Sequence, residues 1–465
     1  MASLVAAARQ VLPVGAQSSL TGGATPRGEV VISTRALNGI GEVSDGGPRR
    51  TVRTGAGVPL SALQRALRSA GLYYPPVPTY DGAFLGGTIA TNAAGAATFK
   101  YGSARPWVER MTVVLADGSI LELRRGDVVA SPDGWFELER PGGALVRIPV
   151  PTYAMPEVAK LSAGYYARAG KDLVDLFVGS EGTLGFIVDA DVRVIPRPRA
   201  CAALVRCTSD GQAIALTAAL RREAAASWRG EGPLDVSAVE FMDQRALAVV
   251  PAEAFARAGV ARPAAPDVML LAQIEVPGDA DATLQRLQDV LDASGVDADP
   301  HMAMPGDLEG AARLFELRES VPASVNAVVA AAKQTYPDIE KTAADLVVPF
   351  ERLANALALY RETFERHAVP YAIWGHVSDG NLHPNVIPQS WEHVERGRKA
   401  ILEMAHAVIA MGGAPLAEHG VGRSTLKQRL LRDLYGERGI AEMRAVKRAL
   451  DPEWKFSPGV LFQRG

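Results

Sequence analysis

Gly179-Ser-Glu-Gly-Thr-Leu-Gly185 is one of three glycine-dense segments that decide how this chain of 465 residues is interpreted. The other two are Pro13-Val-Gly-Ala-Gln-Ser-Ser-Leu-Thr-Gly-Gly23 and Gly86-Gly-Thr-Ile-Ala-Thr-Asn-Ala-Ala-Gly95, the latter followed by Lys100-Tyr-Gly102. Because glycine has no Cβ, loops of this kind let the backbone approach a large flat ligand closely. Backbone N–H groups and hydroxyls in the first segment can converge on an anion. Neither the Walker sequence nor G-x-G-x-x-G is present, so the pattern predicts a cofactor site of another type.

The composition excludes several classes of protein. Lys and Arg number 49 against 52 Asp and Glu, a net charge of −3, whereas a protein that neutralises nucleic-acid phosphates is usually basic. No apolar stretch approaches the roughly 18 residues that span a bilayer. Cys201 and Cys207 lie in one β-like run that would hold them about 20 Å apart, too far for a disulfide. We therefore expect a cytoplasmic protein without a transmembrane segment, with peripheral attachment to the inner membrane as a second option.

The pattern of short β-rich runs and glycine turns predicts an α+β fold. At roughly 150 residues per domain, the length indicates two or three domains. A first domain over residues 1–197 ends at Pro196-Arg-Pro-Arg199, where two prolines terminate the last strand. Within it, leucines at helical spacing predict a helix over 59–70 that ends at Gly71. The predicted strands are Val30–Ser33, Thr51–Thr54, Met111–Leu115 and Phe186–Ile195.

A second domain is expected over residues 198–415. Alternating helical and strand patterns predict an antiparallel sheet with helices on one face. The remaining residues, 416–465, form a C-terminal segment with a helix near its middle. The expected elements are helices over 211–226, 284–291, 350–367, 391–411 and 430–450, and a strand over 268–276.

All seven histidines lie in the last part of the chain, from His301 onwards. His376-Val-Ser-Asp-Gly-Asn-Leu-His383 places two imidazoles on either side of an Asp-Gly-Asn turn, which predicts a strand–turn–strand loop that folds both rings towards one point. Glu418-His419 adds a carboxylate and a third imidazole. Two His and one Glu are a usual set of three protein ligands for a catalytic metal. The histidines on predicted helices are instead interpreted as packing residues: His367, His393 and His406.

The three glycine segments resemble the flavin-binding loops of the vanillyl-alcohol-oxidase/PCMH family of FAD-binding oxidases and dehydrogenases. Asp451-Pro-Glu-Trp-Lys-Phe-Ser-Pro-Gly-Val460 resembles the C-terminal signature of that family. The resemblance implies a PCMH-type FAD-binding domain of two α+β subdomains, a cap domain, and a C-terminal segment that returns to the flavin. No early histidine is available for covalent attachment, so we expect noncovalent FAD. The implied cofactor contacts are Pro13, Gly15, Ala16, Gln17, Ser18, Ser19, Thr21, Gly22, Pro76, Gly86, Gly87, Asn92, Gly95, Tyr101, Gly102, Gly179, Glu181, Gly182, Thr183, Gly185 and Ile187.

The chain departs from the family pattern at its beginning. Only 12 residues precede Pro13, whereas family members usually carry a first strand and helix there. The loop itself is Gly15-Ala-Gln-Ser18 in place of the usual Gly-Gly-Gly-Thr. We therefore expect either a start assigned too late or a flavin site that lacks this edge element.

The histidine pattern resembles the metal-dependent branch of the family, which contains D-lactate, glycolate and D-2-hydroxyglutarate dehydrogenases. The resemblance implies a divalent metal, with zinc expected, and a substrate arginine whose guanidinium suits a carboxylate. A surface helix arginine is the alternative for that position. In Lys341-Thr-Ala-Ala-Asp345, which resembles another site segment, the lysine is offset from the expected position. The implied roles are metal binding for His376, His383 and Glu418, general base for His419, and substrate binding for Arg318 and Asn385.

The resemblance implies an FAD-dependent oxidation of a 2-hydroxy acid to the 2-oxo acid. The metal would lower the pKa of the hydroxyl, His419 would take its proton, and the hydride would pass to the flavin. Two alternatives stay open: a metal-free FAD alcohol or sugar oxidase, and a non-catalytic flavin-fold subunit of a dehydrogenase complex. We expect a quinone, a cytochrome or an electron-transfer flavoprotein as electron acceptor, no nucleic-acid partner, and leave a homodimer open.

Overall fold

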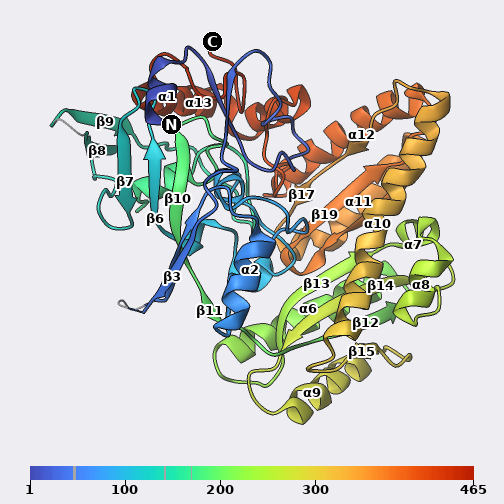
Figure 1. The fold of residues 1–465 in the computed structure, drawn as a ribbon. Helices are drawn as coiled ribbons and strands as arrows, with labels where there is room; N and C mark the ends of the chain where they lie inside the picture. The colour runs from blue at the N-terminus through green and yellow to red at the C-terminus, as the bar shows by residue number, and fades with distance from the viewer. Residues whose placement is uncertain (46–48, 141–142, 169) are drawn as a thin grey trace.

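The computed structural model describes residues 1–45, 49–140, 143–168 and 170–465 (Figure 1). A β-rich N-terminal body lies beside a larger body built on one broad sheet with helices packed on it. The C-terminal helix α13 (Thr425–Leu450) packs against the N-terminal body, where it contacts β9 (Leu145–Pro149). Among the described residues, no helix combines the length and the apolar character needed to cross a bilayer.

The N-terminal body is built from a parallel strand pair and a five-stranded antiparallel sheet. The pair joins β1 (Val11–Val14) to β2 (Val30–Ser33). The strands of the sheet, in spatial order, are β3 (Ile40–Ser44), β4 (Thr51–Gly55), β10 (Phe186–Arg193), β6 (Val108–Val114) and β7 (Ile120–Arg124). Two further antiparallel strand pairs lie in this body, β5 (Leu72–Tyr73) with β11 (Ile195–Pro196) and β8 (Trp135–Glu139) with β9 (Leu145–Pro149). Its short helices are α1 (Ala2–Ala7), α2 (Leu60–Ser69), α3 (Leu85–Ala90), α4 (Thr98–Tyr101), η1 (Arg105–Trp107) and α5 (Leu173–Phe177).

The predicted helix over 59–70 is confirmed as α2, because its apolar residues face the core and its last turn ends in glycine. Leu60, Leu63 and Leu67 are buried, and Gly71 adopts φ +68°, which a glycine accepts without strain. The four predicted strands are confirmed as well, as β2, β4, β6 and β10.

The larger body has an eight-stranded antiparallel sheet. Seven of its strands follow one path, in the spatial order β15 (His301–Ala303), β12 (Ala200–Cys207), β14 (Val268–Glu275), β13 (Asp235–Met242), β18 (Tyr371–His376), β19 (Asn381–Val386) and β16 (Thr342–Ala343). The eighth, β17 (Leu346–Val347), lies off this path and pairs with β19. The strand predicted over 268–276 is confirmed as β14. Cys201 and Cys207 lie on β12, and both thiols are buried and unbridged in the described chain.

Helices cover both faces of this sheet, so the expectation of a single covered face is wrong. Alternate residues of β12 face opposite sides: Ala203 packs with α6 (Asp210–Trp228), and Leu204 packs with α10 (Leu308–Thr335). α10 was not predicted from the sequence. Because both faces are apolar, the central strands are buried throughout and show no alternation. The other helices are α7 (Gln244–Val249), α8 (Ala252–Ala258), α9 (Ala280–Ala293), η2 (Phe350–Arg352), α11 (Leu353–Arg366), η3 (Val377–Asp379) and α12 (Trp391–Ala410).

The C-terminal residues return to the glycine segments of the N-terminal body. Ser457 donates its backbone N–H to the carbonyl of Val11 over 2.8 Å and its hydroxyl to the carbonyl of Gly182 over 2.9 Å. The buried ammonium of Lys447 donates to the carbonyl of Thr183 over 2.7 Å and lies 2.8 Å from Asp451 Oδ2. These contacts bind the end of the chain to the third glycine segment and to β1, the strand that leads into the first.

Candidate active site

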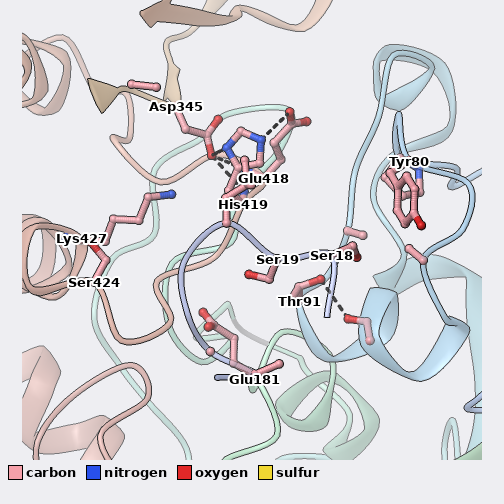
Figure 2. A pocket seen from close by; sticks show the side chains of 18 of the residues that line it. Ser18, Ser19, Tyr80, Thr91, Glu181, Asp345, Glu418, His419, Ser424 and Lys427 are labelled. Atoms are coloured by element: carbon pink, nitrogen blue, oxygen red, sulfur yellow. Dashed lines mark hydrogen bonds and ion pairs between the residues drawn. The ribbon is translucent and has the colours of Figure 1, made fainter. Parts of the chain in front are cut away.

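One cavity of about 1410 Å³ connects the glycine segments to the histidine strands of the larger body. Its walls come from the first two glycine segments on one side and from β18, β19 and the Glu418-His419 segment on the other. Figure 2 shows Asp345, Glu418 and His419 together on one wall and Ser18 and Ser19 facing them across the opening. Pockets for drug-sized ligands usually enclose about 300–1000 Å³, so this cavity has room for a cofactor and a substrate together.

Twelve of the predicted cofactor residues line this cavity. Gly87 is the clearest case, because a Cβ built there would meet no described heavy atom within 4 Å. The position therefore opens directly into the cavity and fits a flat ligand that approaches the backbone. The twelve residues are Pro13, Gly15, Ala16, Gln17, Ser18, Ser19, Gly86, Gly87, Glu181, Gly182, Gly185 and Ile187.

The other nine predicted cofactor residues lie outside the described lining, and some of them have other contacts in the fold. Asn92 accepts the backbone N–H of Arg105 over 3.0 Å and donates to the carbonyl of Leu161 over 3.2 Å. Tyr101 donates its hydroxyl to Glu275 over 2.6 Å. At Gly95 an added Cβ would collide with the carbonyl of Val77. The nine residues are Thr21, Gly22, Pro76, Asn92, Gly95, Tyr101, Gly102, Gly179 and Thr183.

Glu181 ties the third glycine segment to the segment that carries His419. Its two carboxylate oxygens accept the backbone N–H groups of Val421 and Gly422, each over 2.7 Å. Burial raises the pKa of Glu181 to about 7, although both hydrogen bonds oppose the shift. The loop that lines the cofactor end of the cavity and the loop that carries the imidazole are thus held together directly.

Three imidazoles converge on one carboxylate oxygen at the other end of the cavity. His376 ends β18, His383 lies in β19, and the turn between them is η3 followed by Gly380 at φ +79°. The predicted strand–turn–strand arrangement is therefore confirmed. Nε2 of His376, His383 and His419 lies 3.4, 3.3 and 3.6 Å, respectively, from Oε1 of Glu418.

This donor set fits a divalent metal. The three distances to Glu418 exceed the usual 2.7–3.2 Å of an N–H···O hydrogen bond, so these atoms are spaced more widely than direct hydrogen bonds would place them. Asp345, His383, Glu418 and His419 each place one ligand atom within 4.8 Å of the others. This group contains the predicted ligands His383 and Glu418, adds Asp345 and His419, and does not include the predicted ligand His376. Imidazole and carboxylate ligands of this kind suit zinc and other first-row metals.

Asp345 organises the segment that carries the third imidazole. Its Oδ2 accepts the backbone N–H groups of Glu418 and His419, each over 2.9 Å, and lies 3.1 Å from Nδ1 of His419. Burial alone would raise the pKa of Asp345, but the attraction of His419 outweighs it and holds that pKa well below its ordinary value. Asp345 is therefore an anion that fixes the ring of His419 from the side opposite Nε2.

Lys160 reaches the same cluster from the N-terminal body. Its Nζ lies 3.1 Å from Oε2 of Glu418 and 3.0 Å from Oδ2 of Asp379, with the Lys160 side chain fully buried. Burial tends to raise the pKa of Glu418, but Lys160 and His376 outweigh it and hold that pKa well below its usual range. Glu418 thus presents one oxygen to the lysine and the other to the imidazoles.

The predicted substrate residues Arg318 and Asn385 both line the cavity. Arg318 lies on α10 but is only 4% exposed, which rules out the alternative of a surface arginine. Its guanidinium contacts Glu240 at 2.6 Å and Glu319 at 3.2 Å. Asn385 donates to the carbonyl of His383 over 2.7 Å, and its Oδ1 is buried without a hydrogen-bond partner among the described residues. Lys341 also lines the cavity.

Sequence reasoning missed Glu240 and Lys160, and it quoted Asp345 without a role. Glu240 lies on β13 with Oε1 2.5 Å from Nδ1 of His376. A charged residue between the apolar Val239 and Phe241 is the signal that was available for it. Lys160 lies outside the helices and strands, so no periodic sequence pattern sets it apart.

Comparisons with known proteins identify the family of this chain. Residues 194–461 match the family described as FAD linked oxidases, C-terminal domain, and residues 1–124 match an FAD binding domain. Glycolate oxidase subunit GlcD of Bacillus subtilis (strain 168) is 29% identical over 98% of this chain and 84% of that protein. D-2-hydroxyglutarate dehydrogenase of Xanthomonas citri pv. viticola is 29% identical over 97% of this chain and 84% of that protein.

A solved structure of alkyldihydroxyacetonephosphate synthase has the same fold, with a TM-score of 0.63 and 16% identity, over 98% of this chain and 74% of that one. The match to the C-terminal domain of FAD-linked oxidases covers more than half of the chain. The chain therefore belongs to the family of FAD-linked oxidases, which are oxidoreductases.

Proposed function

We propose that this protein oxidises a 2-hydroxy acid to the 2-oxo acid, with noncovalently bound FAD as the electron acceptor and a divalent metal, zinc in our expectation, at the histidine cluster. The observation that carries the proposal is the single cavity, which has glycine loops at one end and imidazoles and carboxylates at the other. The names of the relatives, a glycolate oxidase subunit and a D-2-hydroxyglutarate dehydrogenase, support the substrate class.

In this proposal, Gly15, Ser18, Ser19 and Gly87 would hold the FAD, and His376, His383 and Glu418 would hold the metal. When bound, FAD supplies an acceptor for two electrons, and the metal supplies a Lewis acid that makes the substrate hydroxyl more acidic. Side chains of the protein itself carry out proton transfer and substrate binding.

His419 is the proposed general base. Because Asp345 lies 3.1 Å from Nδ1, Nε2 is the ring atom that remains to accept the hydroxyl proton of the substrate. The C–H bond at Cα would break as the C=O bond forms, and the FAD that Gly15, Ser18, Ser19 and Gly87 would hold would supply the acceptor for the hydride. The proton stays on His419 until the product leaves.

Arg318 and Asn385 are the proposed substrate contacts. Arg318 keeps N–H groups that its bonds to Glu240 and Glu319 do not use, because a guanidinium has five. Asn385 offers a buried Oδ1 that lacks a partner among the described residues. A carboxylate and a hydroxyl together match this pair of donor and acceptor.

An absorbance spectrum of the purified protein tests the proposal, followed by anaerobic addition of D- and L-2-hydroxy acids. Bleaching of the flavin by one of these acids supports it, and a colourless protein refutes it. Turnover that survives complete removal of metal would instead favour the metal-free oxidase. A quinone, a cytochrome and an electron-transfer flavoprotein are then compared as electron acceptors. Light scattering tests whether the protein is a homodimer. Membrane fractionation tests its peripheral attachment to the inner membrane.

A further inference from the structure

Glu240 is placed beside His376 by the pairing of two strands. β13 and β18 run antiparallel, and their register sets Glu240 directly opposite His376. Side chains in directly opposite positions lie on the same face, with Cβ atoms about 4.5–5.5 Å apart. The contact between this carboxylate and the imidazole is therefore fixed by the sheet and does not depend on a loop.

The two oxygens of Glu240 have different partners. Oε1 lies 2.5 Å from Nδ1 of His376, and Oε2 accepts from Nε of Arg318 over 2.7 Å and lies 2.6 Å from its Nη2. Because Oε1 occupies Nδ1, only Nε2 of His376 faces the cavity, where it lies 3.4 Å from Oε1 of Glu418. Glu240 thus determines which nitrogen of His376 is presented.

The fold alone does not require an acid at this position. Ala238 and Met242, the neighbours two residues away on the same strand, are fully buried apolar residues. Glu240 is therefore an exception to the apolar packing of this face of β13. A buried row of arginine, carboxylate and imidazole is less favourable than apolar packing of similar volume in many proteins, so its presence here calls for a role in the site.

We propose that Glu240 is a positioning residue for the divalent ion: it holds the ring of His376 so that Nε2 faces Glu418, and Arg318 in turn holds Glu240. The inference rests on the proposed function, because it takes His376 as a ligand. A carboxylate that accepts the second ring N–H is a common companion of metal-binding histidines, and its loss typically lowers metal affinity 10–100-fold. Arg318 then serves both the metal site and the substrate.

The zinc affinity of the FAD-loaded protein tests this inference. Competition with a chromophoric chelator at fixed pH would compare wild type, Glu240→Gln and Glu319→Gln, with the melting temperature measured for each. Glu319→Gln is the matched control, because Glu319 also contacts Arg318 but is partly exposed and lies on α10, away from the strand pair that holds His376. We expect Glu240→Gln to bind zinc about 10–100-fold more weakly and the control to bind like wild type.

The outcomes separate the inference from the function on which it rests. If wild type binds no zinc, the proposed metal site fails. If wild type binds zinc and Glu240→Gln binds it equally well, the positioning role is overturned, and a lower melting temperature alone would leave Glu240 a purely structural residue. Should Glu240→Gln not fold, Glu240→Asp decides: it keeps a carboxylate near Arg318 and His376, but its shorter side chain draws the oxygen back from Nδ1 of His376, so unchanged zinc affinity would overturn the proposal.

Discussion

Oδ2 of Asp345 lies 3.1 Å from Nδ1 of His419 and accepts the backbone N–H groups of both Glu418 and His419. One buried carboxylate therefore sets both the position of the segment and the orientation of the ring, with Nε2 turned towards the cavity. The same relationship between an acid and the far nitrogen of a catalytic imidazole recurs in enzymes that use histidine as a base.

His419→Gln should remove the general base but leave FAD and zinc bound. We expect turnover to fall about 10²–10⁴-fold, the usual contribution of a general base, while FAD content and zinc content stay at wild-type levels. Steady-state kinetics with metal analysis of the same preparation checks this. Normal turnover in the variant would remove His419 from the mechanism.

Asp345→Asn should act through His419. An asparagine of the same size can donate as well as accept a hydrogen bond, so it no longer fixes the ring in one protonation form. We expect a loss of turnover of at least about 10²-fold. If zinc content also falls, Asp345 is itself a ligand, as its distance to the other donors allows. Full activity with full metal content would contradict the orienting role.

His383→Ala should lose metal and activity together, because it removes one of the donors around Glu418. His406→Ala is the matched control, since His406 is about half exposed and pairs with Asp433, away from the histidine cluster. Metal analysis of both variants, together with turnover, is the measurement. Retention of zinc by His383→Ala would place the ion elsewhere.

Lys160→Met should destabilise the metal-free protein strongly. The change leaves Glu418 and Asp379 buried without their cation, and breaking a buried ion pair in this way costs about 3–5 kcal/mol. Arg147→Met is the control, because the Arg147–Glu137 pair is exposed and worth about 0–1 kcal/mol. Thermal denaturation should show a clear loss for the first variant only, and equal melting temperatures would refute the buried pairing.

Glu181 should make stability depend on pH. Its pKa is raised to about 7 by burial, against an ordinary value of 4.5, so the folded chain keeps a proton that the unfolded chain has lost. The resulting stabilisation is full below pH 4.5 and disappears as pH rises through 7, by at most about 1.4 kcal/mol per pH unit. Melting temperatures from pH 5 to 8.5 should fall more steeply for wild type than for Glu181→Gln. Parallel profiles would contradict this.

The parts of the molecule that rest on local signals could be predicted from the sequence. The leucine spacing and Gly71 identify α2, and the Asp-Gly-Asn turn correctly separates the strands of His376 and His383. The eight-stranded sheet of the larger body was harder to predict from the sequence. Helices cover both of its faces, so its strands lack the alternation of buried and exposed residues that a half-exposed sheet shows. The glycine motifs also gave an incomplete description, since Gly95 serves backbone packing rather than the cavity.

The supporting charges of the site could not be predicted, because their partners are distant in the sequence. Glu240 reaches His376 across a strand pair, and Lys160 reaches Glu418 from another part of the fold. Neither residue lies in a local sequence pattern that indicates its partner. Only the folded chain brings them together, and the buried charges then identify them as parts of the site.

The decisive experiment is anaerobic reduction of the bound flavin by a 2-hydroxy acid, before and after metal removal. We expect one 2-hydroxy acid to bleach the flavin absorbance, chelation to stop the bleaching while the flavin stays bound, and added zinc to restore it. Bleaching that is unchanged after complete metal removal, or a flavin that no 2-hydroxy acid reduces, would refute metal-assisted oxidation of a 2-hydroxy acid by this protein.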